Sequence, residues 1–281
     1  MKWKGRQGSS NVEDKRGMTG KSMAGIGGGV GLVIVLIVTL LGGNPSDLLG
    51  SLNSTEPNNG SSYVETDEEK ELAQFVSVVL AETEQVWTKE FRKNGLEYRE
   101  PTLVMYSGSV ESACGMAASS VGPFYCPGDM KLYIDLSFYQ ELKQEFQAPG
   151  DFAMAYVIAH EVGHHVQTLL GTTKKEMPDR SKVSETEYNR YSVRLELQAD
   201  YLAGVWAHHV QGENLLEEGD LEEALNAASG VGDDRIQKKA QGYVVPDSFT
   251  HGTAEQRKRW FNKGFKSGDM NEGNTFKANS L

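Results

Sequence analysis

Apolar and polar positions divide this chain into a polar start, an uncharged run, a linker and a long mixed stretch. Residues 1–22 are polar, with six basic side chains, and are predicted to be a disordered tail. Residues 23–43 carry no charge, and their length suits one membrane-spanning helix. Residues 44–66 are rich in Ser, Asn, Gly and Pro, which predicts a flexible linker.

Residues 67–281 have the pattern of one domain built from helices and a few strands. Apolar stripes and capping residues predict helices at 68–94, 138–146, 151–171, 184–212, 220–228 and 233–241. In the third of these helices, Asp151 is expected to cap the start and Gly171 to end the helix. Another helix follows Thr253, and 101–106 and 131–136 are predicted strands. The expected fold is α+β, mostly helical with a small sheet, behind one N-terminal transmembrane helix.

The third of these helices carries H-E-V-G-H at positions 160–164. Because residues four apart share a helix face, His160 and His164 can bind one zinc ion. Glu161 borders the same site and can take a proton from a zinc-bound water, as a metalloprotease requires. The alternative is a core helix with surface histidines. Apolar residues on most sides of this helix favour burial, and buried polar groups need partners such as a metal.

A catalytic zinc site normally has three protein ligands. The predicted helix at 184–212 contains Glu196 and Asp200, which are four apart and share a face. Glu196 is the candidate third ligand, and Asp200 can hydrogen-bond a ligating histidine. The alternative is that both are solvated acids on an exposed face.

These motifs together resemble a known group of enzymes. H-E-V-G-H followed by E-L-Q-A-D is similar to gluzincin metallopeptidases, whose third ligand is a Glu in an E-x-x-A-D pattern. A fuller resemblance, to the bacterial "putative neutral zinc metallopeptidase" family of membrane proteins, adds GPFYCPGDMKLYIDLSFY (122–139) and DSFTHGTAEQR (247–257). It covers nearly the whole chain. It implies a zincin-like zinc peptidase on a bacterial plasma membrane anchor and leaves the peptide or protein substrate open.

The resemblance also draws attention to His251, which precedes the last predicted helix. In related gluzincins a Thr-His segment with a following Arg lies beside the zinc, and here it maps onto His251 and Arg257. Either side chain could stabilise the oxyanion of the reaction. The fit is partial, because Gly252 stands where those enzymes often have Pro. The alternative is that His251 caps or packs a turn.

In gluzincins an edge strand also pairs with the extended substrate backbone. Here that strand is expected at Lys131 to Leu136 or within Gly122 to Cys126, and the sequence does not decide between the two.

Charge bears on partners and on membrane topology. A net charge of −11 gives no electrostatic reason to expect nucleic acid binding. Basic residues precede the apolar run, and residues 44–62 contain no Lys or Arg. The positive-inside rule therefore predicts a cytoplasmic N-terminus and a domain facing the periplasm or exterior. A cleaved signal peptide is the competing interpretation, but the run is long and no A-x-A site follows it.

Cys114 and Cys126 are the only cysteines. In an oxidising compartment a disulfide between them is expected, with two free buried thiols as the alternative. The predicted function is zinc-dependent (Zn²⁺) hydrolysis of peptide bonds by a membrane-anchored metallopeptidase with Glu161 as general base. The alternatives are a scaffold protein with an inactive metal site and a structural domain without metal.

Overall fold

The computed structural model describes residues 1–17 and 63–281. The predicted membrane crossing at 23–43 and nearly all of the predicted linker lie outside these residues. Over the described ranges, no helix combines the length and the apolar character that a membrane crossing requires.

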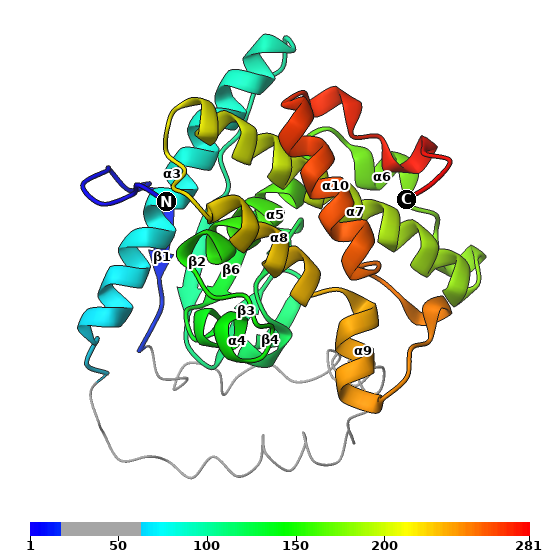
Figure 1. The fold of residues 1–281 in the computed structure, drawn as a ribbon, viewed down its shortest axis with the longest axis horizontal. Helices are drawn as coiled ribbons and strands as arrows, with labels where there is room; N and C mark the ends of the chain where they lie inside the picture. The colour runs from blue at the N-terminus through cyan, green and yellow to red at the C-terminus, as the bar shows by residue number, and fades with distance from the viewer. Residues whose placement is uncertain (18–62) are drawn as a thin grey trace.

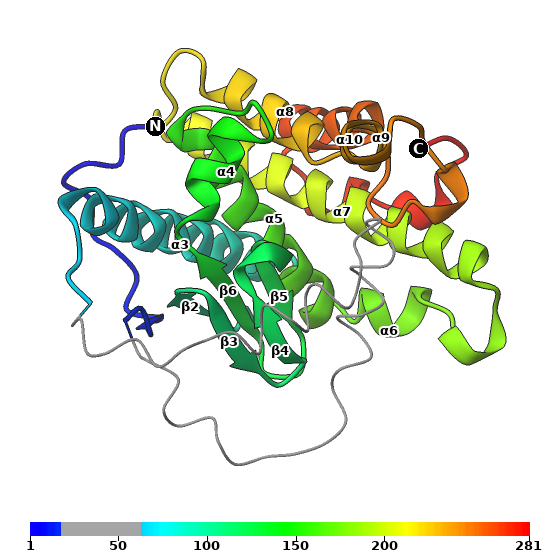
Figure 2. The same ribbon diagram turned by 90° about the horizontal axis from the view of Figure 1, so that it is seen from below.

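Helices make up most of the fold, and α5 lies at its centre (Figures 1 and 2). On one side of α5 lie the sheet and α3; on the other lie α7, α8 and α10. The helices are α3 (Asp67–Lys93), α4 (Phe138–Gln144), α5 (Asp151–Leu169), α6 (Thr172–Glu176), α7 (Glu185–Gly212), α8 (Asp220–Gly230), α9 (Asp233–Gln241) and α10 (Ala254–Ser267). Short 3-10 turns occupy Ser119–Val121, Arg180–Lys182, Pro246–Ser248, Met270–Glu272 and Thr275–Lys277.

The main sheet has the strand order β1-β2-β6-β5. β1 (Val12–Asp14), β2 (Thr102–Tyr106) and β6 (Lys131–Asp135) are parallel, and β5 (Phe124–Cys126) runs antiparallel to β6. β3 (Ser109–Ser112) and β4 (Gly115–Ala118) form a separate hairpin, which the Cys114–Cys126 disulfide joins to β5. The strands predicted at 101–106 and 131–136 are present. β5 lies within 122–126, which the sequence offered as a possible edge strand, whereas β1, β3 and β4 were not predicted.

Local signals account for several of the helix boundaries but not for the start of α5. Thr66 caps α3, and Gly171, with φ of 69°, follows the end of α5 as predicted. The cap expected from Asp151 is wrong, because Gly150 is the N-cap of α5 and has no side chain that could accept a hydrogen bond from the first turn. The Phe152 N–H instead donates to Glu223 of α8 at 3.0 Å. The connection between α5 and α7 contains α6 and a 3-10 turn.

Close backbone contact holds α7 and α10 together. A methyl group at Gly204 would lie 2.0 Å from the Phe261 carbonyl oxygen, and one at Gly264 would lie 1.9 Å from the Tyr201 carbonyl oxygen. Only glycine permits this approach. On the other side of α7, Phe152 stacks on Trp206 at 5.6 Å. The helix that carries the H-E-x-x-H motif is therefore fixed on the α7–α10 pair.

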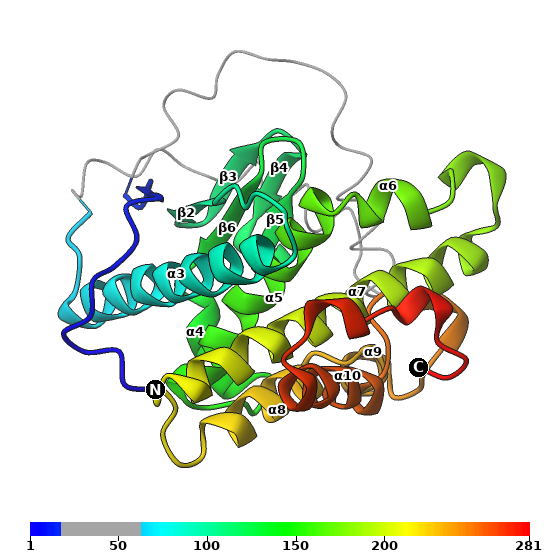
Figure 3. The same ribbon diagram turned by 90° about the horizontal axis from the view of Figure 1, so that it is seen from above.

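The disordered tail predicted at 1–22 is wrong for residues 1–17, which are packed on the domain. Figure 3 shows this segment running past α3 to the sheet. Met1 and Trp3 are buried in the hydrophobic core, and β1 pairs with β2. The composition of the segment suggested disorder because its apolar partners lie far away in the sequence.

Candidate metal centre

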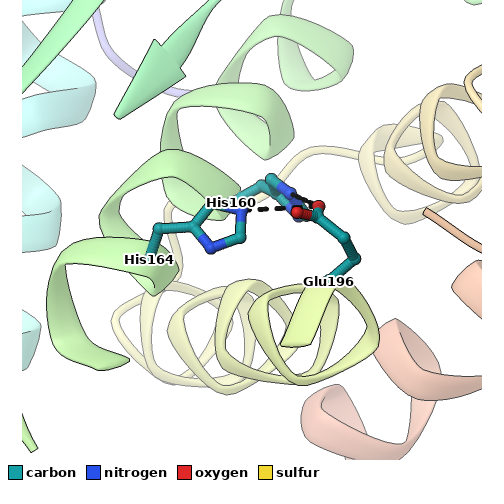
Figure 4. A group of neighbouring side chains, drawn as sticks. All are labelled: His160, His164 and Glu196. Carbon is teal, nitrogen blue, oxygen red and sulfur yellow. Dashed lines mark hydrogen bonds and ion pairs between the residues drawn. The ribbon is translucent and has the colours of Figure 1, made fainter. Parts of the chain in front are cut away.

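The candidate metal centre lies where α5 and α7 approach each other. The motif glycine, Gly163, faces Ala199, and a methyl group on Gly163 would lie 3.0 Å from the Ala199 carbonyl oxygen. Small residues on both helices therefore permit the short separation at this point. His164 directly follows Gly163, and His160 and Glu196 each lie three residues before this contact on their own helix. The three side chains face one another (Figure 4).

The three side chains have the spacing of zinc ligands. Glu196 Oε2 lies 3.1 Å from His160 Nε2 and 3.4 Å from His164 Nε2. In a tetrahedral zinc site with bonds of about 2.1 Å, ligand atoms lie about 3.4 Å apart. Two imidazole nitrogens and one carboxylate oxygen are also a usual ligand set for catalytic zinc. The residues present therefore fit a zinc ion.

The other ring nitrogen of each histidine has a partner. His160 Nδ1 lies 2.9 Å from Asp200 Oδ1, and His164 Nδ1 lies 2.9 Å from Gln167 Oε1. With Nδ1–H donating to these oxygens, both Nε2 atoms are free to bind a metal. The structure thus places Asp200 in its expected position behind His160. The role of Gln167 was missed, although its position three residues after His164 on the same helix was a usable signal.

Charge also favours a cation at this position. Burial alone would raise the pKa of Glu196, but the nearby imidazoles of His164 and His160 hold it well below its ordinary value. Burial lowers the pKa of His164, but the neighbouring Glu196 carboxylate outweighs this effect and raises the pKa of His164 to about 9. The carboxylate of Glu196 is therefore ionised at neutral pH and available as an anionic ligand.

Arg257 lies behind the centre on the Asp200 side. Its Nε donates to Asp200 Oδ2 at 2.9 Å and its Nη2 to Oδ1 at 3.0 Å, and both side chains are buried. Tyr156 donates to the same carboxylate at 2.5 Å. Burial would raise the pKa of Asp200, but Arg257 and His160 lower it to about 2. Arg257 therefore lies on the Nδ1 side of His160, whereas Glu196 lies on the Nε2 side.

Glu161 borders the ligand group and is only partly buried. Its desolvation raises its pKa above that of an ordinary glutamate, against the lowering effect of His164 and His160. It is not one of the three clustered metal-binding side chains. Glu161 therefore lies beside the cluster without being one of its potential ligands.

His251 lies near the centre without belonging to the ligand cluster. Burial lowers the pKa of His251, but Asp233 and Glu196 act in the opposite direction and raise it. Asp233 Oδ2 accepts the backbone N–H groups of Thr250, His251 and Gly252 at 2.7–2.9 Å, and its Oδ1 lies 3.3 Å from His251 Nδ1. Asp233 therefore organises the His251 loop.

The remaining histidines have structural partners. His165 lies 2.6 Å from the Arg99 carbonyl oxygen and 3.1 Å from the Tyr125 hydroxyl. His208 and His209 bond to the carbonyl oxygens of Phe265 and Gly268 at the end of α10. None of the three belongs to the metal centre.

A second acidic group, Asp151, Asp220 and Glu223, also has the spacing of a cation site. The amino group of Met1 lies within it, 2.8 Å from Asp151 and 3.2 Å from Asp220. An ammonium group therefore already provides the positive charge at this position.

Comparisons with known proteins agree with the ligand geometry. The sequence profile of the family described as "Putative neutral zinc metallopeptidase" matches residues 1–276. The Escherichia coli K12 protein "Uncharacterized protein YpfJ" is 50% identical over 283 residues, which covers 98% of this chain and 99% of the relative. The Mycobacterium bovis protein "Uncharacterized protein Mb2605" is 43% identical over 195 residues, covering 66% and 65% of the two chains. No solved structure matches this chain. The chain therefore belongs to the family described as "Putative neutral zinc metallopeptidase".

Proposed function

We propose that this protein hydrolyses peptide bonds with a zinc ion held by His160, His164 and Glu196 and with Glu161 as the general base. The observation that carries the proposal is the spacing of the three ligand atoms, 3.1 and 3.4 Å about Glu196 Oε2, with Glu161 next to them on α5. A solvated acidic face would not bury a carboxylate against two oriented imidazoles.

When bound, zinc supplies Lewis acidity, which polarises the peptide carbonyl and lowers the pKa of the attacking water. Glu161 accepts the proton of this water and then delivers it to the leaving amine. The raised pKa of Glu161 suits both steps, because a more basic carboxylate takes the proton more readily. Asp200 and Gln167 hold the two imidazole rings in the orientation that the ligand role requires.

The free edge of β5 is the proposed binding site for the substrate backbone. Among the described strands, β5 pairs only with β6, and its Tyr125 hydroxyl lies against His165 of α5. An extended peptide can add to such an edge by main-chain hydrogen bonds. The sequence left open whether β5 or β6 has this role. β6 is an interior strand between β2 and β5, which favours β5.

His251 is the proposed donor to the oxyanion that forms during hydrolysis. Asp233 fixes both the backbone of the His251 loop and the Nδ1 side of the ring, so that Nε2 is directed away from Asp233. Gly252 adopts φ of 95°, which lets three consecutive N–H groups converge on one carboxylate oxygen. Asp233 is thus a positioning residue for His251.

The proposal is tested with the purified full-length chain. It should contain about one zinc per chain and cleave members of an unbiased peptide library. Removal of the metal by a chelator should abolish cleavage, and added Zn²⁺ should restore it. Zinc binding without cleavage of any library peptide would favour the scaffold alternative, and cleavage that persists in the metal-free protein would contradict the mechanism.

A further inference from the structure

The N-terminal segment, residues 1–17, has a built interface with the rest of the domain. Trp3 packs edge-on against Phe75 of α3 with ring centroids 5.4 Å apart, and 7% of its surface is exposed. β1 forms parallel ladder bonds with β2 over residues 12–14. The Glu13 carboxylate forms an ion pair with Lys131 of β6 at 2.6 Å. The segment thus completes both the core and one edge of the sheet.

Buried acids of α3 find their partners in this segment. Glu82, which is 1% exposed, accepts a hydrogen bond from Arg6 Nε at 2.6 Å. Glu84 accepts from Ser9 Oγ at 2.7 Å and from Asn11 Nδ2 at 2.9 Å. Burial raises the pKa of Glu84, while the Asn11 and Ser9 hydrogen bonds partly offset this effect. A buried carboxylate is costly without such partners, so the sequences of α3 and the N-terminal segment are matched.

Three of the six basic residues that indicated a cytoplasmic tail have acidic partners in the domain. Lys4 pairs with Glu71 at 2.6 Å, in addition to the Arg6–Glu82 pair. Arg16 Nη2 contacts Glu65 at 2.7 Å and Asp14 at 2.6 Å. These positive charges therefore serve the fold, and counting them as a topology signal overstates the charge bias across the apolar run.

The two described ends that flank residues 18–62 lie side by side. A Cβ atom at Gly17 would lie 2.5 Å from the Tyr63 side chain, and Arg16 also reaches the Glu69 carbonyl oxygen. A single crossing between these ends would separate them by the hydrocarbon core, about 30 Å. That separation is incompatible with a 2.7 Å contact between Arg16 and Glu65.

We propose that residues 1–17 and 63–281 lie on the same side of the membrane and form one folded unit there. This proposal replaces the expected pairing of a cytoplasmic tail with an external domain. It does not depend on peptidase activity, because it rests on contacts outside the metal centre. The Cys114–Cys126 disulfide favours an oxidising compartment for the shared side.

Labelling of single introduced cysteines in the full-length chain tests the shared side. Lys4→Cys and Lys182→Cys form a matched pair, since the two lysine side chains are 75% and 78% exposed. In intact cells, a membrane-impermeant maleimide should label both variants or neither, and lysis should expose both. Labelling of one position and protection of the other would overturn the proposal.

A cross-link tests the docked segment directly. A Cβ atom at Gly8 would lie 3.1 Å from Ser77 Cβ, close to the spacing of a disulfide, about 3.8 Å. Gly8→Cys/Ser77→Cys should therefore form a disulfide on mild oxidation in native membranes, detected by mass spectrometry of the linked peptides. Gly5→Cys/Ser77→Cys is the control, because a Cβ atom at Gly5 has no neighbour within 4 Å. Linkage no greater in the first variant than in the control would also overturn the proposal.

Discussion

Asp200→Asn should weaken both the fold and the metal centre, because the carboxylate has close contacts to three buried side chains. It accepts hydrogen bonds from Tyr156 at 2.5 Å and from Arg257 at 2.9 and 3.0 Å, and it lies 2.9 Å from His160 Nδ1. Asparagine preserves the shape but loses the charge and one acceptor oxygen. Arg257 is then left buried without an anion.

The structure gives the size of the effect. Removing one partner of a buried ion pair typically costs about 3–5 kcal/mol. The pKa of Asp200, about 2 against an ordinary 3.8, corresponds to about 2 kcal/mol in favour of the ionised form. Because this pKa is lowered, the contribution is present above pH 3.8 and is lost as the pH falls toward 2. We expect a loss of about 2–5 kcal/mol and about 10–100-fold weaker zinc binding.

Urea unfolding of the zinc-free protein and competition with a chelating dye measure the two effects separately. Asp247→Asn is the control, since Asp247 pairs with Arg190 on the surface at 3.7 Å and should contribute less than about 1 kcal/mol. Asp200→Asn/Arg257→Met removes both buried charges and should cost less than the sum of the two single changes. Additive losses, or an unchanged unfolding midpoint for Asp200→Asn, would refute the buried pair.

Two further predictions concern packing and pH. Gly204→Ala should cost at least about 1–3 kcal/mol of unfolding free energy, because its methyl group would overlap the Phe261 backbone. Gly212→Ala is the control and should be nearly neutral, because the space around Gly212 is open. Equal urea midpoints for the two variants would contradict the α7–α10 contact. Burial lowers the pKa of His165, so the unfolded chain binds the extra proton and stability should fall as the pH drops below about 6.5, by at most about 1.4 kcal/mol per pH unit. His165→Gln should reduce this slope between pH 7.5 and 5.5, and an unchanged slope would count against the assignment.

Local patterns in the sequence predicted most of the helices and singled out the three side chains that cluster in the structure. The four-residue spacings of His160 and His164, and of Glu196 and Asp200, define helix faces without any knowledge of tertiary structure. The sequence could not show that Gly163 and Ala199 bring the two faces within reach of one ion, since that depends on how the helices pack.

Long-range partners explain what sequence reasoning missed. Residues 1–17 have the composition of a tail, and Trp3 and Arg6 find Phe75 and Glu82 some seventy residues later. β5 has three residues, too few for alternation to be recognised. Asp233 acts on a loop that begins 17 residues after it, so its local sequence indicated only a charged helix start.

Glu161→Gln most directly tests the central claim that Glu161 is the base beside a zinc ion held by three other side chains. Zinc content and peptide hydrolysis are measured together for the full-length parent, Glu161→Gln and Glu196→Gln. The account predicts that Glu161→Gln retains full zinc and loses hydrolysis by about 10²–10⁴-fold, because the amide cannot accept the proton. Glu196→Gln should lose zinc and activity together. Hydrolysis by Glu161→Gln at the parent rate, or full zinc in Glu196→Gln at limiting metal, would contradict the account.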